Sequence, residues 1–308
     1  MKSTVLILFV LLAINAMGKG ENLKIDKAIA QLELLHKKVL LAPDTTKIVL
    51  NNEFKEALNK LLYNFQSLTY DLSKLKSVSV LTDPENRFRI YTWPLEISPG
   101  NYDYYGFTQY SISKKQQKVK VVELENSVFN MTHKNDQVYE SNQWRGGLYY
   151  ALVPSGKKKS STYLMLGWDG FGKRSTKKLI EVISFNSIGE PSFGAPVLYF
   201  EEVEKKKSFR EKKKLKVVKY KVKYRHEFEY SAKVSMMLRY DEHLKMVVFD
   251  HLTPINPKLA SVRATYVPDY SYDGLFMKKG KWYFKNNLDL RNETLPKAKK
   301  YKPSDVKQ

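Results

Sequence analysis

The last quarter of the chain contains a histidine and several aspartates that could take part in acid–base chemistry. Asp250 is followed directly by His251, and Asp269 and Asp273 come later. General acid–base catalysis needs a histidine or carboxylates within hydrogen-bond reach of one another, and a hairpin would make this possible for Asp241 and Asp250. Ordinary turn formation accounts for the same residues, because Asp269 follows Pro268 and aspartate is common in turns. Acid–base chemistry is therefore an alternative to a structural role.

An aromatic residue beside an exposed carboxylate is a common way to build a carbohydrate site, because the ring stacks on the sugar and the carboxylate accepts hydrogen bonds from hydroxyl groups. Trp168-Asp169 has this pattern, and Tyr272-Asp273 repeats it. A glycine follows each pair, so a tight Asp-Gly turn, which needs the positive φ that glycine tolerates, is the simpler interpretation. The candidate binding residues, all at predicted strand ends or loops, are Trp168, Asp169, Arg239, Asp250, His251, Asp269, Tyr272 and Asp273.

Neither a metal nor a cofactor is predicted. His226, His243 and His251 could bind a divalent ion with a carboxylate, but their spacing matches no compact metal motif, and His226 falls on the apolar side of a predicted strand. The chain has no cysteine, which excludes disulfides, a thiol nucleophile and cysteine-ligated metal centres. It also has no Gly-x-Ser-x-Gly elbow, no Walker loop and no Gly-x-Gly-x-x-Gly before a helix.

The chain is strongly basic, with 53 Lys and Arg against 32 Asp and Glu and a formal net charge of +21. Residues 157–225 contain nineteen of the cations and seven of the acids. Such a surface attracts polyanions, with an affinity that falls as salt rises, or it is solvated and has no partner. For an exported protein we expect lipopolysaccharide, an acidic glycan or anionic lipid, and no nucleic acid. The predicted polyanion patch consists of Lys157, Lys158, Lys159, Lys205, Lys206, Lys207, Lys212, Lys213, Lys214, Lys219, Lys221 and Lys223.

The first eighteen residues have the order of a secretory signal peptide. Lys2 supplies the positive charge, residues 4–16 are almost entirely apolar, and Ala16 and Gly18 put small residues before a cleavage site. The apolar run is shorter than the ~20 residues that span a bilayer, which disfavours the alternative of an uncleaved anchor. We therefore predict residues 1–18 as a signal peptide, cleavage after Gly18, and a periplasmic or secreted protein that does not span the membrane afterwards.

A helical subdomain is predicted next, over residues 19–78. Apolar residues recur at three- and four-residue intervals in residues 23–41 and again in residues 54–68, which predicts two amphipathic helices that pack antiparallel. Pro43-Asp44 ends the first helix, and Asn51 or the following asparagine could cap the second.

Residues 79–292 are predicted to form an antiparallel β domain, because turn residues separate short runs rich in β-branched and aromatic side chains and no crossover helix intervenes. The fold class is thus mainly β (α+β), with an N-terminal helical pair followed by a large antiparallel β sandwich or barrel-like domain. Residues 217–230 alternate as one long strand, residues 201–216 form an exposed connection or short helix, and residues 293–308 form a basic disordered tail. The predicted strands are 88–93, 104–112, 119–124, 148–153, 162–167, 178–185, 197–200, 217–230, 233–240, 245–250, 274–277 and 282–285.

Several short motifs follow one another in a fixed order. They are YLMLGWDG (163–170), KLIEVISF (178–185), GEPSFG (189–194), MLRYD (237–241), VFDHL (248–252) and PDYSYDG (268–274). This order resembles uncharacterised secreted or periplasmic proteins of Bacteroidetes, over roughly residues 88–289. The resemblance implies a Gram-negative envelope setting. The resemblance implies no activity and no catalytic residue for this chain.

Three functions remain open on this basis. We favour an exported, non-enzymatic β protein that binds a glycan, another envelope component or a protein partner. One alternative is a hydrolase or lyase that acts on an envelope or dietary polymer, which requires at least two of the candidate carboxylates to converge in a cleft. The other is a polyanion-binding protein that uses the lysines of residues 157–225.

Overall fold

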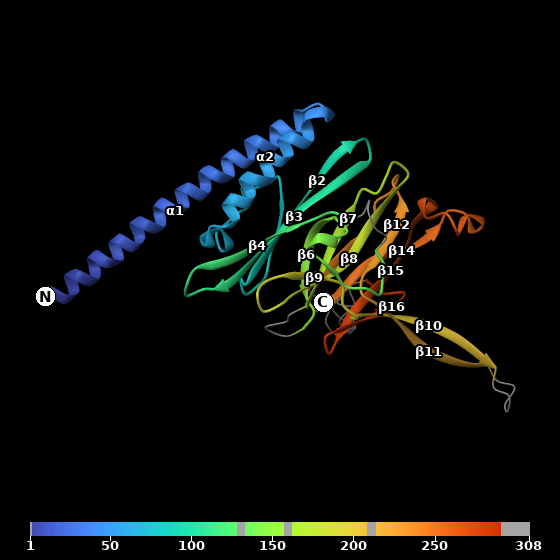
Figure 1. The fold of residues 1–308 in the computed structure, drawn as a ribbon. Helices are drawn as coiled ribbons and strands as arrows, with labels where there is room; N and C mark the ends of the chain where they lie inside the picture. Colours follow the sequence, from blue (N-terminus) through green and yellow to red (C-terminus); the bar gives the residue numbers. More distant parts are fainter. Residues whose placement is uncertain (1, 128–132, 157–161, 208–213, 291–308) are drawn as a thin grey trace, which may run out of the picture.

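The computed structural model describes residues 2–127, 133–156, 162–207 and 214–290. Two helices come first and mainly antiparallel sheets follow, which confirms the predicted fold class (Figure 1). Within the described ranges, no helix is long and apolar enough to cross a membrane. The helical elements are α1 (Lys2–Leu41), α2 (Asp44–Leu62), η1 (Phe65–Leu68), η2 (Ser141–Gln143), η3 (Pro257–Leu259) and η4 (Arg263–Thr265).

The strands form three sheets, which we name the helix-side, central and outer sheets. The helix-side sheet has the order β1 (Ser79–Thr82), β2 (Phe88–Ser98), β3 (Asn101–Ser113), β4 (Lys118–Leu124). The central sheet has the order β5 (Tyr139–Glu140), β9 (Pro191–Phe193), β8 (Ser175–Phe185), β7 (Thr162–Asp169), β6 (Leu148–Pro154), and β12 (His226–Ser231) also pairs with β8. The outer sheet has the order β11 (Lys214–Lys223), β10 (Leu198–Lys207), β16 (Lys281–Lys285), β15 (Tyr266–Lys278), β14 (Met246–Pro254), β13 (Leu238–Asp241). Among these strand pairs only β10 with β16 is parallel.

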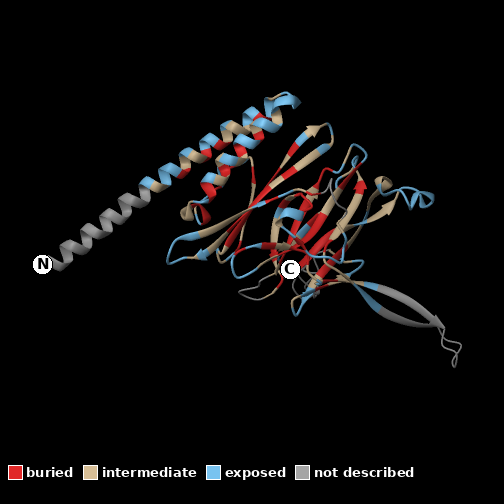
Figure 2. Cartoon of the chain, viewed as in Figure 1, coloured by how far each residue is buried: buried red, intermediate tan, exposed pale blue. Residues whose placement is uncertain are grey.

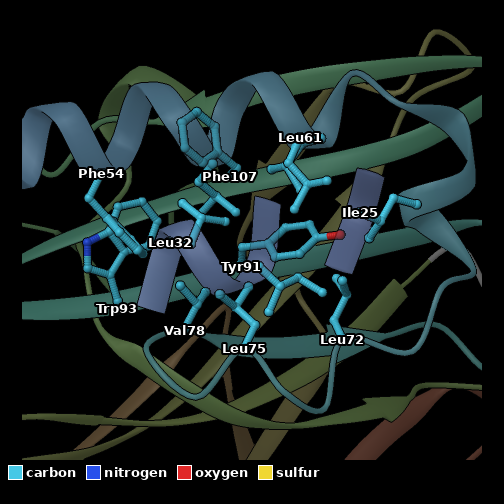
Figure 3. Packing of buried hydrophobic residues seen from close by; sticks show 13 residues of the cluster. Ile25, Leu32, Phe54, Leu61, Leu72, Leu75, Val78, Tyr91, Trp93 and Phe107 are labelled. Atoms are coloured by element: carbon cyan, nitrogen blue, oxygen red, sulfur yellow. The ribbon is translucent and has the colours of Figure 1, made fainter. Parts of the chain in front are cut away.

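The two helices pack antiparallel and cover one face of the helix-side sheet, as the apolar spacing predicts (Figures 1 and 3). Ile25, Leu32 and Phe54 from the helices are buried against Tyr91 and Trp93 from β2. The first helix ends before Pro43, as expected. The second begins at Asp44, earlier than predicted.

Asn51 is not a helix cap. It lies inside α2, is buried, and its Oδ1 accepts a hydrogen bond of 3.0 Å from Trp93 Nε1. A buried indole N–H needs an acceptor, and an asparagine on the packed face of a helix supplies one. The amide side chain therefore joins α2 to the sheet instead of starting the helix.

The central sheet is buried on both faces. Side chains alternate along β7, so that Tyr163 and Met165 pack toward the helix-side sheet, whereas Leu164 and Leu166 pack toward the outer sheet. This explains why β7 is a nearly continuous buried run (Figure 2). The layers thus succeed one another as helices, helix-side sheet, central sheet and outer sheet (Figure 1).

The alternating run 217–230 is not one strand. It belongs to two strands, because β11 ends at Lys223 and pairs with β10 in the outer sheet, whereas β12 begins at His226 and pairs with β8 in the central sheet. Arg225 is buried at the crossing and ion-pairs with Glu181 of β8, Nε to Oε2 3.0 Å. Alternation alone cannot reveal this change of sheet, because the apolar face continues through both strands.

The described parts of residues 201–216 are strands and not the predicted exposed connection or short helix. The two ends of this segment lie in β10 and β11, which pair antiparallel as a hairpin that projects from the outer sheet (Figure 1). In its register Glu202 lies opposite Lys219, whereas Lys205 lies opposite Lys216. Residues 208–213, and the predicted tail at residues 293–308, lie outside the described residues.

Asp83 is the buried carboxylate that joins the turn after β1 to the central sheet. It accepts hydrogen bonds from Arg87 Nε at 2.8 Å and from the Tyr163 hydroxyl at 2.7 Å. Burial raises the pKa of Asp83, but the bonds from Arg87 and Tyr163 lower it by more, and the net pKa lies below its ordinary value. The ionised form of Asp83 is thus favoured in the folded protein. Its contribution to the free energy of unfolding is fully present above the pKa of the unfolded chain, about 3.9, and is lost as the pH falls through the lower pKa of the folded protein.

We therefore expect Asp83→Asn to lower the free energy of unfolding by about 1–3 kcal/mol at pH 7, because the buried Tyr163 hydroxyl and the partly buried Arg87 guanidinium lose an ionised acceptor. The difference between the variant and the wild type shrinks below about pH 4, where the carboxylate gains a proton first in the unfolded chain and, at lower pH, in the folded protein. Urea denaturation at pH 7 and pH 3 measures both effects. The exposed Asp136→Asn is the control. An Asp83→Asn protein as stable as wild type at pH 7 would refute this account.

Candidate binding cleft

A wide bulge between β14 and β15 places His251 at the surface of the outer sheet. The pairing register shifts after Asp250, and residues 269–271 of β15 lie opposite His251 alone. Tyr270 in this bulge has φ +68° and is 92% exposed. Positive φ is rare for residues other than glycine, and both strained backbone and bulges concentrate at functional sites, where they redirect side chains.

The prediction that these acidic segments form turns is wrong. Asp250 and His251 lie within β14, and Asp273 lies within β15. β14 extends as far as Pro254 and β15 runs through Pro268, because each proline sits at a strand end or beside the bulge, where a missing N–H is tolerated. The connection between the two strands therefore lies at residues 255–265, outside the acidic segments in which turns were predicted.

His251 and Asp273 form a close pair across the two strands. His251 Nδ1 lies 2.7 Å from Asp273 Oδ2, and the backbone N–H of Asn287 donates to Asp273 Oδ1 at 2.9 Å. The side chain of Asp273 is 7% exposed, whereas that of His251 is 47% exposed. A buried carboxylate thus orients an accessible imidazole, as in sites where histidine transfers protons.

This pair lines an open cleft of about 420 Å³ between β12 of the central sheet and β14 and β15 of the outer sheet, with η4 at its margin. Aromatic rings form much of its wall, and ionisable groups are interspersed. The lining residues are Lys177, Phe200, His226, Glu227, Phe228, Glu229, Phe249, Asp250, His251, Leu252, Arg263, Tyr266, Asp273 and Phe284.

An ion-pair chain runs from the cleft into the central sheet. Lys177 Nζ and Arg145 Nε each lie 3.1 Å from a carboxylate oxygen of Glu227, and Arg145 Nη2 lies 3.3 Å from Asp169 Oδ2. Burial raises the pKa of Glu227, but the charges of Arg145 and Lys177 lower it by more, so the net pKa is below its ordinary value. Glu227 is therefore an ionised acceptor in the cleft wall.

His226 is a different kind of histidine from His251. Its ring packs on Phe200 and Phe228, at centroid distances of 4.6 and 4.4 Å, and Lys223 Nζ lies 3.2 Å from its Nδ1. Burial, followed by the charge of Lys223, lowers the pKa of His226 to about 3. It is a neutral part of the apolar wall at physiological pH.

The structure brings together only some of the candidate binding residues. Asp250, His251 and Asp273 line the cleft, and Asp269 lies in the bulge beside it, where its Oδ1 accepts from the Ser271 hydroxyl at 2.7 Å. Asp250 is already engaged, because its Oδ2 accepts a 2.7 Å hydrogen bond from the backbone N–H of Met237.

The other candidates lie elsewhere. Tyr272 borders a separate hollow together with Tyr270 and the segment 287–290. Arg239 lies on β13, 54% exposed, and pairs with Asp241 at 2.9 Å. Neither residue reaches the cleft lining.

Trp168-Asp169 does not form an exposed aromatic–carboxylate pair. Asp169 is 7% exposed and accepts from the Tyr104 hydroxyl at 3.1 Å, and Trp168 packs edge-on against Tyr102 at 5.3 Å. The tight turn predicted here is also wrong, because five residues connect β7 to β8 and the φ of Gly170 is not positive. Gly170 is needed for space instead, since a Cβ there would lie 2.4 Å from the Tyr102 ring.

Of the predicted polyanion patch, Lys219 and Lys221 are exposed on β11. Lys223 is turned inward, with its Nζ 4.3 Å from the centroid of the Phe200 ring. Lys157, Lys158, Lys159, Lys212 and Lys213, and the side chains of Lys205, Lys206, Lys207 and Lys214, lie outside the described residues. Polyanion binding by this patch stays a prediction.

Sequence reasoning missed the cleft residues that come from other elements. For Lys177 and Glu227, the alternation of polar and apolar residues indicates only that they face away from the apolar side of their strands. Arg263 and Tyr266 follow residues with neither helical nor strand periodicity. Glu227 reaches the cleft because the chain changes from the outer sheet to the central sheet at Arg225, and no sequence pattern marks that change. Among the described residues, no three His, Asp or Glu side chains are arranged to hold a metal ion.

Comparison with family models, with curated proteins and with solved structures finds no match for this chain.

Proposed function

We propose that this chain is an exported protein that binds a neutral glycan in the cleft between β12 and the β14–β15 bulge. The observation that carries the proposal is the composition of that cleft, in which half-buried aromatic rings alternate with hydrogen-bonding and charged groups. The N-terminal segment, with its positive start and apolar run, supports export.

The aromatic wall favours a ligand with apolar faces. Phe200 stacks on Phe284 at 5.4 Å, and Tyr266 lies near the margin of the cleft with the guanidinium of Arg263 4.6 Å from its ring centroid. The C–H faces of sugar rings pack on such surfaces, and burial of this apolar area contributes to affinity.

The polar groups favour a ligand that both donates and accepts hydrogen bonds. Lys177 and Arg263 are donors, whereas Glu227, Glu229 and Asp273 are acceptors. Sugar hydroxyls serve both roles. Because cations and carboxylates are mixed in the same wall, a neutral ligand fits better than a polyanion, which the carboxylates would repel.

We expect binding of at least one neutral hexasaccharide from a panel of β-1,4-linked glucose, mannose, xylose and N-acetylglucosamine. Arg263→Ala and Tyr266→Ala each remove a group at the cleft margin and should weaken the Kd about tenfold, or about 1.4 kcal/mol. Arg239→Ala, which also removes an exposed arginine but lies outside the cleft, should bind like wild type. Isothermal titration calorimetry measures the Kd values, and circular dichroism verifies folding. Failure of every hexasaccharide to bind, or equal affinity of all three variants, would overturn the proposal.

A further inference from the structure

We propose that His251, oriented by Asp273, is a general base that activates water to hydrolyse an acyl ester carried by the glycan in the cleft. This inference rests on the proposed function, and adds a reaction to it. The substrate class is an O-acylated sugar, and the products are the free sugar hydroxyl and a carboxylic acid.

The pair has the geometry that a base of this kind requires. The carboxylate of Asp273 lies 2.7 Å from His251 Nδ1 and is itself fixed by the backbone N–H of Asn287. A carboxylate at Nδ1 selects the tautomer that carries its hydrogen there, which leaves the lone pair on Nε2. No residue in the described ranges forms a hydrogen bond with Nε2, and the ring is exposed at the cleft.

The other acids and bases of the cleft are already engaged. Glu227 is held ionised by two cations, Glu229 accepts from the Ser175 hydroxyl at 2.8 Å, and Asp250 accepts from the Met237 N–H. Glycosidic cleavage needs a protonated carboxylic acid at the leaving oxygen. The lowered pKa of Glu227 works against that role. Ester hydrolysis needs only one base that later returns its proton, and His251 meets this requirement.

The reaction balances without any further reactant. Nε2 of His251 takes a proton from water while the water oxygen bonds to the acyl carbonyl carbon, which gives a tetrahedral oxyanion. Asp273 stabilises the imidazolium that forms. The C–O bond to the sugar then breaks, and Nε2 gives its proton to the departing sugar oxygen. The guanidinium of Arg263 lines the same cleft and ion-pairs with no carboxylate in the described part of the chain, so its charge is available to the oxyanion.

The charged and titratable groups around His251 come from five elements. Asp250 precedes it on β14, Asp269 and Asp273 lie on β15, Lys177 lies on β8, and Arg263 lies on η4. From β12, the cleft also receives His226, Glu227 and Glu229. Of these groups, Asp273 alone is hydrogen-bonded to the His251 ring in the described residues, and its removal should therefore have the largest effect on kcat.

The test measures acetate release from O-acetylated xylan, mannan and peptidoglycan by the protein and its variants. We expect release by the wild type and a loss of about 10²–10⁴-fold in kcat/KM for His251→Gln. The matched control is His243→Gln, which changes an exposed histidine outside the cleft and should leave the rate unchanged. Asp273→Asn should lower kcat and leave KM nearly unchanged, because the imidazole loses the acceptor that fixes its tautomer and orientation.

The binding readout separates the two proposals. His251→Gln should still bind the deacetylated glycan, because it removes the base and leaves the aromatic wall. Glycan binding without acetate release, or an unchanged rate in His251→Gln, would overturn the catalytic inference and leave the proposed function standing. Acetate release that depends on His251, without binding of any neutral hexasaccharide, would support the base and overturn the proposed ligand.

Discussion

Replacement of Arg225 by methionine is expected to lower the free energy of unfolding by about 3–5 kcal/mol, because it leaves the carboxylate of Glu181 buried without its partner. The guanidinium also donates to the carbonyl oxygens of Gln137 at 2.9 Å and Phe193 at 3.1 Å, and to that of Lys134. These bonds hold the crossing at which the chain leaves the outer sheet for the central sheet. Guanidinium chloride denaturation followed by circular dichroism measures the loss.

Two further variants make this prediction specific. The double variant Arg225→Met with Glu181→Leu removes both charges and should recover part of the stability, because no buried charge is left unpaired. Arg239→Met, at an exposed surface ion pair, should change the free energy by less than about 1 kcal/mol. A double variant that is less stable than Arg225→Met would mean that the buried carboxylate does not cause the loss.

Replacement of Phe54 by alanine should lower the free energy of unfolding by about 3–5 kcal/mol, because it opens a cavity between α2 and the helix-side sheet. Phe54 is fully buried, and its ring packs edge-on against Trp93 at 5.4 Å (Figure 3). Urea denaturation followed by tryptophan fluorescence and by circular dichroism measures the change. Ile48→Ala, on the exposed side of the same helix, is the control and should have a small effect.

The two probes also test whether the helices and strands form one cooperative unit. A shared core of helix and sheet residues should make the transitions coincide. A Phe54→Ala protein of wild-type stability would contradict the packing of α2 on the sheet.

The sequence was sufficient to predict most elements of the fold, because they depend on local patterns. The helical spacing of Ile25, Leu32 and Phe54 identifies the face that is buried, and β-rich runs between turn residues mark strands such as β7. Sheet membership was not predictable, because it depends on contacts between distant residues. Arg225 pairs with Glu181 across the fold, and nothing in its neighbourhood indicates that the strand ends there.

The same distinction applies to the site. His251 and Asp273 were candidates because histidine and carboxylates at predicted strand ends or loops are able to do acid–base chemistry, and the structure joins these two. The turn interpretation failed because the bulge at Tyr270 absorbs the residues that propensity assigns to a turn. Lys177 and Glu227 reach the cleft from the central sheet, and only the packing of one sheet on another brings them there.

The most direct test of the central claim is a map of backbone amide chemical shifts during titration with the hexasaccharide that binds most tightly. We predict saturable shifts at His251, Tyr266 and Asp273 and in β12, with little change in the helices. Saturable shifts confined to the α1–α2 layer or to the β10–β11 hairpin, with the cleft residues unmoved, would contradict the assignment of the cleft as the binding site.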